Sequence, residues 1–158
     1  MMEVSIDGAC VPINPGGTGC IGYVIKNSGI KIVEDSKIIG KGKGMMNNVA
    51  EYNALIFALR RLSQLKLENE HIIVKSDSNL LVNQMNRKWK VKAFNLMPLV
   101  REARTLAANF HIRIEWIHRD ENKEADGLTN SAYARSSKEM SKTEPISEKT
   151  SENLYSYL

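Results

Sequence analysis

The chain is poor in the residues that would mark it as a disulfide scaffold, a zinc protein or a membrane protein. Its 158 residues include two cysteines and three histidines, and they form no Cys/His cluster with zinc spacing. Cys10 and Cys20 flank a predicted turn and could face each other, but in a reducing compartment two free core thiols are the simpler interpretation. No apolar run approaches about 18 residues and no signal peptide is evident, so we expect a cytoplasmic protein without a membrane partner.

The composition is that of one soluble globular domain. Hydrophobic residues make up 42% and charged residues 25% of the chain, and 158 residues suffice to bury a sizeable core. The net charge of +4 mildly favours a polyanionic partner.

The order of predicted elements indicates an α/β fold. Residues 2–10, 19–27 and 30–40 read as strands joined by short turns, which predicts an antiparallel meander. A helix over 48–67, a strand over 71–75, two further helices, a strand over 111–117 and a last helix ending near Ala134 follow. This order predicts a mixed five-stranded sheet, with the meander, two parallel strands and helices on both faces.

The C-terminal segment has a different composition from the rest. From residue 136 to 158 it is rich in Ser, Lys, Glu and Thr, which predicts a polar, flexible tail after a domain formed by residues 1–135. Its end, Leu154–Leu158, is apolar enough to dock on the body.

Four acidic residues stand where they could converge. Asp7 lies in the first strand, Asp77 follows a strand, Glu51 opens a helix and Asp126 lies on the face of another helix. Each also has an ordinary explanation. Asp7 and Asp77 could cap a turn or a helix, Glu51 could form a capping box with Asn48 as N-cap, and Asp126 could be an exposed helix residue.

The segment 87–92 carries four basic residues around Trp89. Such a run is commonly a solvated loop, but an aromatic ring among cations also suits a sugar–phosphate backbone.

Five short pieces of the sequence together resemble the type 1 ribonuclease H family over residues 2–135. They are Ile6-Asp7-Gly8, Asn14-Pro15-Gly16, Asn47-Asn48 ahead of Glu51, Ser76-Asp77-Ser78 and Asn122-Lys123-Glu124-Ala125-Asp126. The basic protrusion of some members is reduced to the run 87–92, so the match is to the compact, archaeal-type branch.

The resemblance implies the ribonuclease-H-like fold and an endonuclease that hydrolyses the RNA strand of RNA–DNA hybrids, leaving 3′-hydroxyl and 5′-phosphate ends. It also implies that Asp7, Glu51, Asp77 and Asp126 bind two Mg²⁺ or Mn²⁺ ions, for which carboxylates are suitable hard ligands. The implied partner is the hybrid. Double-stranded RNA is a possible second substrate. We expect the protein to be a monomer.

The resemblance further implies contacts to the substrate. Those beside the acids would come from Gly8, Cys10, Asn14, Gly16, Asn47, Asn48 and Ser78, and those to the phosphates from Lys88, Trp89 and Lys90. Each Asn could instead serve a turn or a cap. Met46 stands where the family often has a Thr that helps to hold a DNA phosphate.

The loop before the last helix is too short to carry the histidine that many relatives place there. Only Asp120 and Glu121 separate Arg119 from Asn122. Strand alternation predicts a buried, neutral His118 beside Trp116 and places Arg119 elsewhere. We therefore assign Arg119, whose guanidinium forks well onto a phosphate, to the scissile or adjacent phosphate.

Two other functions fit the same fold. A non-catalytic hybrid-binding module is disfavoured because a pure binder has no use for four converging negative charges. Another nuclease of the ribonuclease-H-like fold is disfavoured by the match to the hybrid-reading segments and by the Gly16-Gly17 turn.

Overall fold

The computed structural model describes the backbone of residues 1–155 and the side chains of residues 1–139. Five strands and four α-helices follow one another in the order that the sequence predicts. They are β1 (Met2–Val11), β2 (Thr18–Asn27), β3 (Ile30–Lys41), α1 (Asn47–Gln64), β4 (His71–Ser76), α2 (Asn79–Met85), α3 (Met97–Ala107), β5 (His111–Trp116), a 3₁₀ turn η1 (Arg119–Glu121) and α4 (Lys123–Tyr155).

The strands form a single mixed sheet in the order β3-β2-β1-β4-β5. β1 and β2 pair antiparallel, as do β2 and β3, whereas β4 pairs parallel with both β1 and β5. The predicted meander and the two parallel strands are therefore confirmed. β1, at the centre, is the strand at which the antiparallel part of the sheet meets the parallel part.

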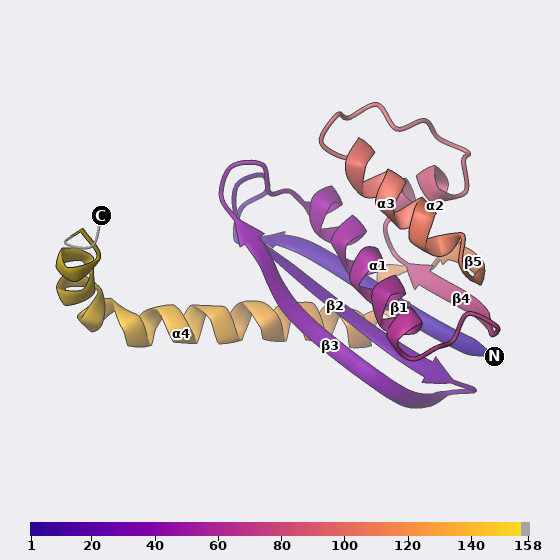
Figure 1. Ribbon diagram of the computed structural model, residues 1–158, viewed down its shortest axis with the longest axis horizontal. Helices are drawn as coiled ribbons and strands as arrows, with labels where there is room; N and C mark the ends of the chain where they lie inside the picture. Colours follow the sequence, from indigo (N-terminus) through magenta and orange to yellow (C-terminus); the bar gives the residue numbers. More distant parts are fainter. Residues whose placement is uncertain (156–158) are drawn as a thin grey trace.

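Helices cover both faces of the sheet, also as predicted (Figure 1). On one face, α1 lies over β1 and β2 with α3 beside it, and buries Ala54, Leu55, Ala58, Leu59 and Leu62. On the other face, α4 packs against β1, β2 and β3. Alternate side chains of β1 point to opposite faces of the sheet. Met2, Val4 and Ile6 therefore point to the same face, where they join the core beneath α1.

Two glycines allow helices to approach β1 and β2 closely. A Cβ on Gly8 would lie 2.4 Å from the backbone of Ala50 and Glu51, and a Cβ on Gly22 would lie 2.6 Å from the carbonyl of Ala125. Gly22 is the register partner of Asp7. The first turn of α1 is thus held against β1 at Gly8, and the first turn of α4 against β2 at Gly22, beside Asp7.

The two cysteines do not face each other. Cys10 pairs with Gly19 and Cys20 with Ala9, so the two thiols leave opposite faces of the sheet. Both are buried and free, as expected.

The last helix is longer than the sequence predicts. Helix α4 continues from Lys123 to Tyr155 rather than ending near Ala134, and in Figure 1 its C-terminal half extends away from the sheet. The Ser, Lys, Glu and Thr composition is therefore compatible with helical backbone. The side chains of Leu154–Leu158 lie outside the described residues, and the division into a domain and a tail stays a prediction. No helix within the described range is long and apolar enough to cross a membrane.

Candidate active site

The four predicted acids line one cavity at the edge where β4 ends. The pairing of β1 with β4 stops at Ile6 and Ser76, so from Asp7 onward β1 pairs only with β2. This leaves an opening beside Asp7, of about 240 Å³. The cavity is lined by Asp7, Gly8, Ala9, Asn47, Glu51, Asp77, Arg119 and Asp126.

Each acid reaches the cavity from a different element. Asp7 comes from β1, and Asp77 follows the last residue of β4. Glu51 comes from the start of α1, which can lie close to β1 because Gly8 has no side chain. Asp126 comes from the first turn of α4, which can lie close to β2 because Gly22 has none. Strand ends and helix starts meet here, as is typical of ligand sites at the carboxyl edge of α/β sheets.

The predicted caps of α1 and α2 are wrong, and this removes the structural explanations for Glu51 and Asp77. The N-cap of α1 is Met46, without a side-chain hydrogen bond, and Asn48 lies inside the helix, so Glu51 forms no capping box. The N-cap of α2 is Ser78, whose Oγ accepts from Leu81 N at 3.2 Å. Neither carboxylate is therefore used to hold a helix end.

Burial and mutual repulsion make these charges costly. Asp7 is only 8% exposed, and burial, followed by the charges of Asp77, Asp126 and Glu51, raises its pKa from 3.8 to about 7, against the lowering effect of a Thr129 hydrogen bond. Burial, together with the charge of Asp77, raises the pKa of Glu51 from 4.5 to about 7, although a hydrogen bond with Ser78 opposes this. A cation in the cavity would relieve both effects.

The donor set fits a hard divalent cation. All four acids offer carboxylate oxygens, the ligands that Mg²⁺ and Mn²⁺ prefer. The basic side chain that lines the cavity, Arg119, keeps its Nη2 3.8 Å from Asp126 Oδ1 and is 81% exposed, so it compensates little of the buried charge. In the described part of the chain no three such side chains already surround a common point.

Asn122 is a residue of the site that the sequence does not single out. It is 1% exposed, and its Nδ2 donates to the carbonyl of Ile6 at 2.8 Å and to Asp77 Oδ2 at 3.3 Å. The backbone carbonyl of Asn122 accepts a hydrogen bond from Asp126 N at 3.1 Å. One residue thus connects β1, Asp77 and the start of α4. Its position four residues before Asp126 was the available signal.

Thr129 is a second residue that the sequence did not reveal. It is 2% exposed and lies one helical turn after Ala125, whose carbonyl accepts from its Oγ1 at 2.9 Å. The Thr129 side chain also favours the charged form of Asp7 by lowering its pKa. A Thr in a helix interior is too common a feature to predict this contact.

The predicted substrate-contacting residues divide into two groups. Gly8 and Asn47 line the cavity, Ser78 bonds with Glu51, and Asn48 is half-buried within α1. Cys10, Asn14 and Gly16 instead fasten the first turn to the start of α1. Cys10 N donates to Asn47 Oδ1 at 2.8 Å, Asn47 N donates to Asn14 Oδ1 at 3.1 Å, and Gly16 N donates to Met45 O at 2.8 Å.

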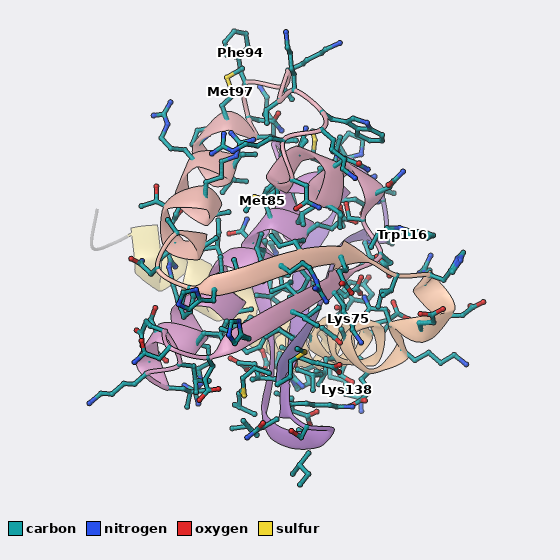
Figure 2. The ribbon with its side chains drawn as sticks, turned by 90° about the vertical axis from the view of Figure 1, so that its right-hand side faces the viewer. Lys75, Met85, Phe94, Met97, Trp116 and Lys138 are labelled. Carbon is teal, nitrogen blue, oxygen red and sulfur yellow. The ribbon has the colours of Figure 1, made fainter. Side chains whose placement is uncertain are left out.

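The basic run forms a hollow of its own, separate from the acids. Leu80, Lys88, Trp89, Lys90 and Lys92 line about 420 Å³ beside the loop that joins α2 to α3. The loop is anchored where Lys88 N and Trp89 N both donate to Asn83 O. Trp89 is 46% exposed, and Figure 2 shows Phe94 and Met97 projecting outward at the far end of the molecule. The run is therefore a concave, basic surface.

The predicted burial of His118 is wrong. β5 ends at Trp116, so strand alternation no longer applies two residues later, and His118 is exposed. Its ring lies against Trp116, with centres 4.6 Å apart, and Trp116 itself projects from the side of the molecule (Figure 2). Arg119 lines the acidic cavity, and its contact with a phosphate stays a prediction.

Comparisons with known proteins find similar sequences and similar folds. A model of the reverse transcriptase-like family matches residues 5–132. The bifunctional protein Rv2228c of Mycobacterium tuberculosis is 38% identical over 119 residues, which are 75% of this chain and 31% of that protein. The chain thus spans about a third of the length of this curated relative.

Solved structures are also similar. LC11-RNase H1 in complex with RNA/DNA hybrid has a TM-score of 0.79 and 32% identity, over 86% of this chain and 99% of that one. RNase H1 of the halophilic archaeon Halobacterium salinarum has a TM-score of 0.77 and 29% identity, over 85% of this chain and 98% of that one.

Proposed function

Because the chain belongs to the reverse transcriptase-like family and, within it, to the type 1 ribonucleases H, we propose that it is an endonuclease that hydrolyses the RNA strand of RNA–DNA hybrids. The products would carry 3′-hydroxyl and 5′-phosphate ends. The observation that carries this proposal is the convergence of Asp7, Glu51, Asp77 and Asp126 on one cavity. We assign the activity to residues 1–135 and expect a monomer to suffice, since all four acids come from one chain.

The carboxylates of Asp7, Glu51, Asp77 and Asp126 would hold two Mg²⁺ or Mn²⁺ ions. Such ions activate a water molecule for attack on the phosphorus and stabilise the departing oxygen on the opposite side of it. Asn122 would orient the Asp77 carboxylate through the hydrogen bond described above, and Thr129 would favour the charged form of Asp7. Arg119, exposed at the rim, would bind the scissile or adjacent phosphate.

The substrate follows from the relatives and from the second surface. LC11-RNase H1 binds an RNA/DNA hybrid in its solved complex, which supports a hybrid as the substrate here. The hollow around Lys88, Trp89 and Lys90 offers charge and an aromatic face to a backbone at a distance from the acids. Polar groups of the first turn and of Asn47 would read the 2′-hydroxyl.

A substrate panel tests the proposed function. Labelled hybrid, double-stranded RNA and double-stranded DNA are incubated with the protein and Mg²⁺, Mn²⁺ or a chelator, and the products are separated on a gel. We expect metal-dependent cleavage of the RNA in the hybrid. Binding of the hybrid without cleavage would identify a binding module, and cleavage of DNA would identify another nuclease of this fold.

Replacing Asn122 by Ala should lower turnover by about tenfold to a hundredfold, because the Asp77 carboxylate loses a partner that orients it. The Michaelis constant should change much less. Asn130→Ala, at an exposed position in helix α4, is the matched control. Equal losses in both variants, or a loss explained by a lower melting temperature alone, would contradict this role of Asn122.

Replacing Arg119 by Ala should lower turnover at least about tenfold, in keeping with the loss of one preorganised donor to a phosphate. His118→Ala should change turnover and stability little, since His118 is exposed and does not line the cavity. Arg101→Ala, an exposed position on α3, controls for the loss of a charge. Steady-state kinetics with the hybrid as substrate measure the turnover of each variant. If His118→Ala lost turnover while Arg119→Ala kept it, the phosphate-binding role would belong to His118 and not to Arg119.

Replacing Lys88, Lys90 and Lys92 together by Ala should raise the Michaelis constant for the hybrid and flatten its dependence on salt, since each phosphate contact releases counterions. Turnover should fall less. The control is the replacement of Lys31, Lys37 and Lys41, which are exposed on the edge strand β3 and remove the same charge. A salt slope equal to that of the wild type would show that the run is a solvated loop.

A further inference from the structure

A second group of metal-binding side chains lies at the other end of the strands from the acids. His71 is the first residue of β4, His111 is the first residue of β5, and the two are register partners. Their ring centres are 5.5 Å apart and their planes are inclined by 41°. Both residues are exposed, so neither imidazole is used to fill the core.

The two rings lie at a surface hollow of about 330 Å³. It is lined by Met1, His71, Ile72, Ile73, His111, Ile112 and Arg113. The charge of Arg113 is compensated, because its Nε lies 2.7 Å from Glu115 Oε1. The metal-binding side chains of this hollow are therefore the two imidazoles and the Met1 thioether, in contrast to the carboxylates of the acidic cavity.

The spacing of the rings suits one shared ion. Two imidazoles that bind a tetrahedral Zn²⁺ at about 2.0 Å have ring centres roughly 5 Å apart, close to the 5.5 Å found here. Imidazole favours Zn²⁺, Ni²⁺ and Cu²⁺ over Mg²⁺. We propose that His71 and His111 form a site for a borderline transition-metal ion, bound by one nitrogen from each ring with water completing its coordination.

This site is independent of the proposed hydrolysis. Asp77 follows the sixth and last residue of β4, so at about 3.3 Å per residue it lies roughly 20 Å from His71. β5 is an edge strand whose sheet partner is β4. An ion held by both histidines would join the beginnings of these two strands and stabilise the edge of the sheet, because it binds the folded state alone.

Titration calorimetry with NiCl₂ tests the proposal on the full chain, in excess MgCl₂ so that the acidic cavity is occupied. We expect one Ni²⁺ per chain, with binding at least about tenfold weaker in His71→Ala and in His111→Ala. The chain has three histidines, and the third, the exposed His118, gives the matched control: His118→Ala should bind as the wild type does. With Cu²⁺, electron paramagnetic resonance should show two nitrogen ligands in the wild type and one in either single variant.

Three results would overturn the site. They are no Ni²⁺ binding by the wild type, undiminished binding by a variant that lacks both His71 and His111, and loss of binding in His118→Ala. Circular dichroism shows whether the variants are folded, and the exposure of both rings predicts that they are. Cleavage of hybrid by His71→Ala and His111→Ala in MgCl₂ should equal that of the wild type, so failure of this site and failure of the proposed hydrolase function give different results.

Discussion

Asp7→Asn should abolish cleavage of the hybrid and also stabilise the metal-free protein at pH 8. The activity should be lost because one of the four carboxylates proposed to hold the metal ions is removed with little change in volume, at a cost of several kcal/mol in transition-state stabilisation. Cleavage at more than about a tenth of the wild-type rate would contradict the assignment, since one tenfold step corresponds to only about 1.4 kcal/mol. Asp120→Asn, an exposed acid in the turn η1, is the control.

The gain in stability follows from the sign of the pKa shift. Burial and the neighbouring acids raise the pKa of Asp7 from 3.8 to about 7 in the folded protein. Its contribution to stability is therefore fully present below about pH 4 and is lost as the pH rises through about 7. At pH 8 the wild type carries the whole cost, up to roughly 4 kcal/mol, whereas an Asn carries none.

Thermal melts with and without metal measure this effect. In chelator at pH 8, Asp7→Asn should melt above the wild type, and the difference should shrink toward pH 4. Mg²⁺ should raise the melting temperature of the wild type at pH 8, because it binds the folded state, and should raise that of Asp7→Asn far less. A metal-free variant that melts below the wild type at pH 8 would show that Asp7 is held by contacts other than the proposed ions.

Glu51→Gln should lower the cleavage rate steeply and leave the metal-free fold as stable as before, or more stable. Glu51 forms no capping box in α1, and its pKa of about 7 reflects burial and the charge of Asp77, so removing the charge relieves a cost. Gln keeps the volume and an oxygen that can accept from Ser78. Rates on the hybrid and melting curves in chelator measure the two effects, with Glu121→Gln in η1 as the control.

The opposite pattern would be informative for Glu51. A clear fall in melting temperature together with retained cleavage would make it a structural residue and would leave Asp7, Asp77 and Asp126 as the metal-binding acids. The substitution therefore separates the two explanations that the sequence alone left open.

The sheet and the acids were predictable because local signals agreed with the topology. Short turns after β1 and β2 require antiparallel neighbours, and a helix between strands requires a parallel crossover. Asp77 directly follows β4, and Asp7 lies in the adjacent strand β1 just past the end of the β1–β4 pairing, which brings the two acids close together. The sequence could not show the opening beside Asp7, which depends on β4 ending at Ser76 opposite Ile6.

The errors arose where tertiary contacts replaced local rules. Asn48 is a good N-cap by type, but the first N–H of α1 is satisfied by Asn14 from a distant turn. His118 was predicted buried by extending strand alternation past the end of β5. Asn122 owes its contacts to residues more than forty positions away in the chain, and no local pattern contains that information.

The most direct test of the central claim is an analysis of the ends that the protein leaves on an RNA strand cut within a hybrid. A polymerase extends fragments with a 3′-hydroxyl and does not extend those with a cyclic phosphate. Metal-activated water at the four acids predicts extendable 3′ ends and 5′-phosphates, formed with Mg²⁺ or Mn²⁺ and absent with chelator or in Asp7→Asn. Cyclic phosphate ends, or cleavage that persists in chelator, would contradict the account.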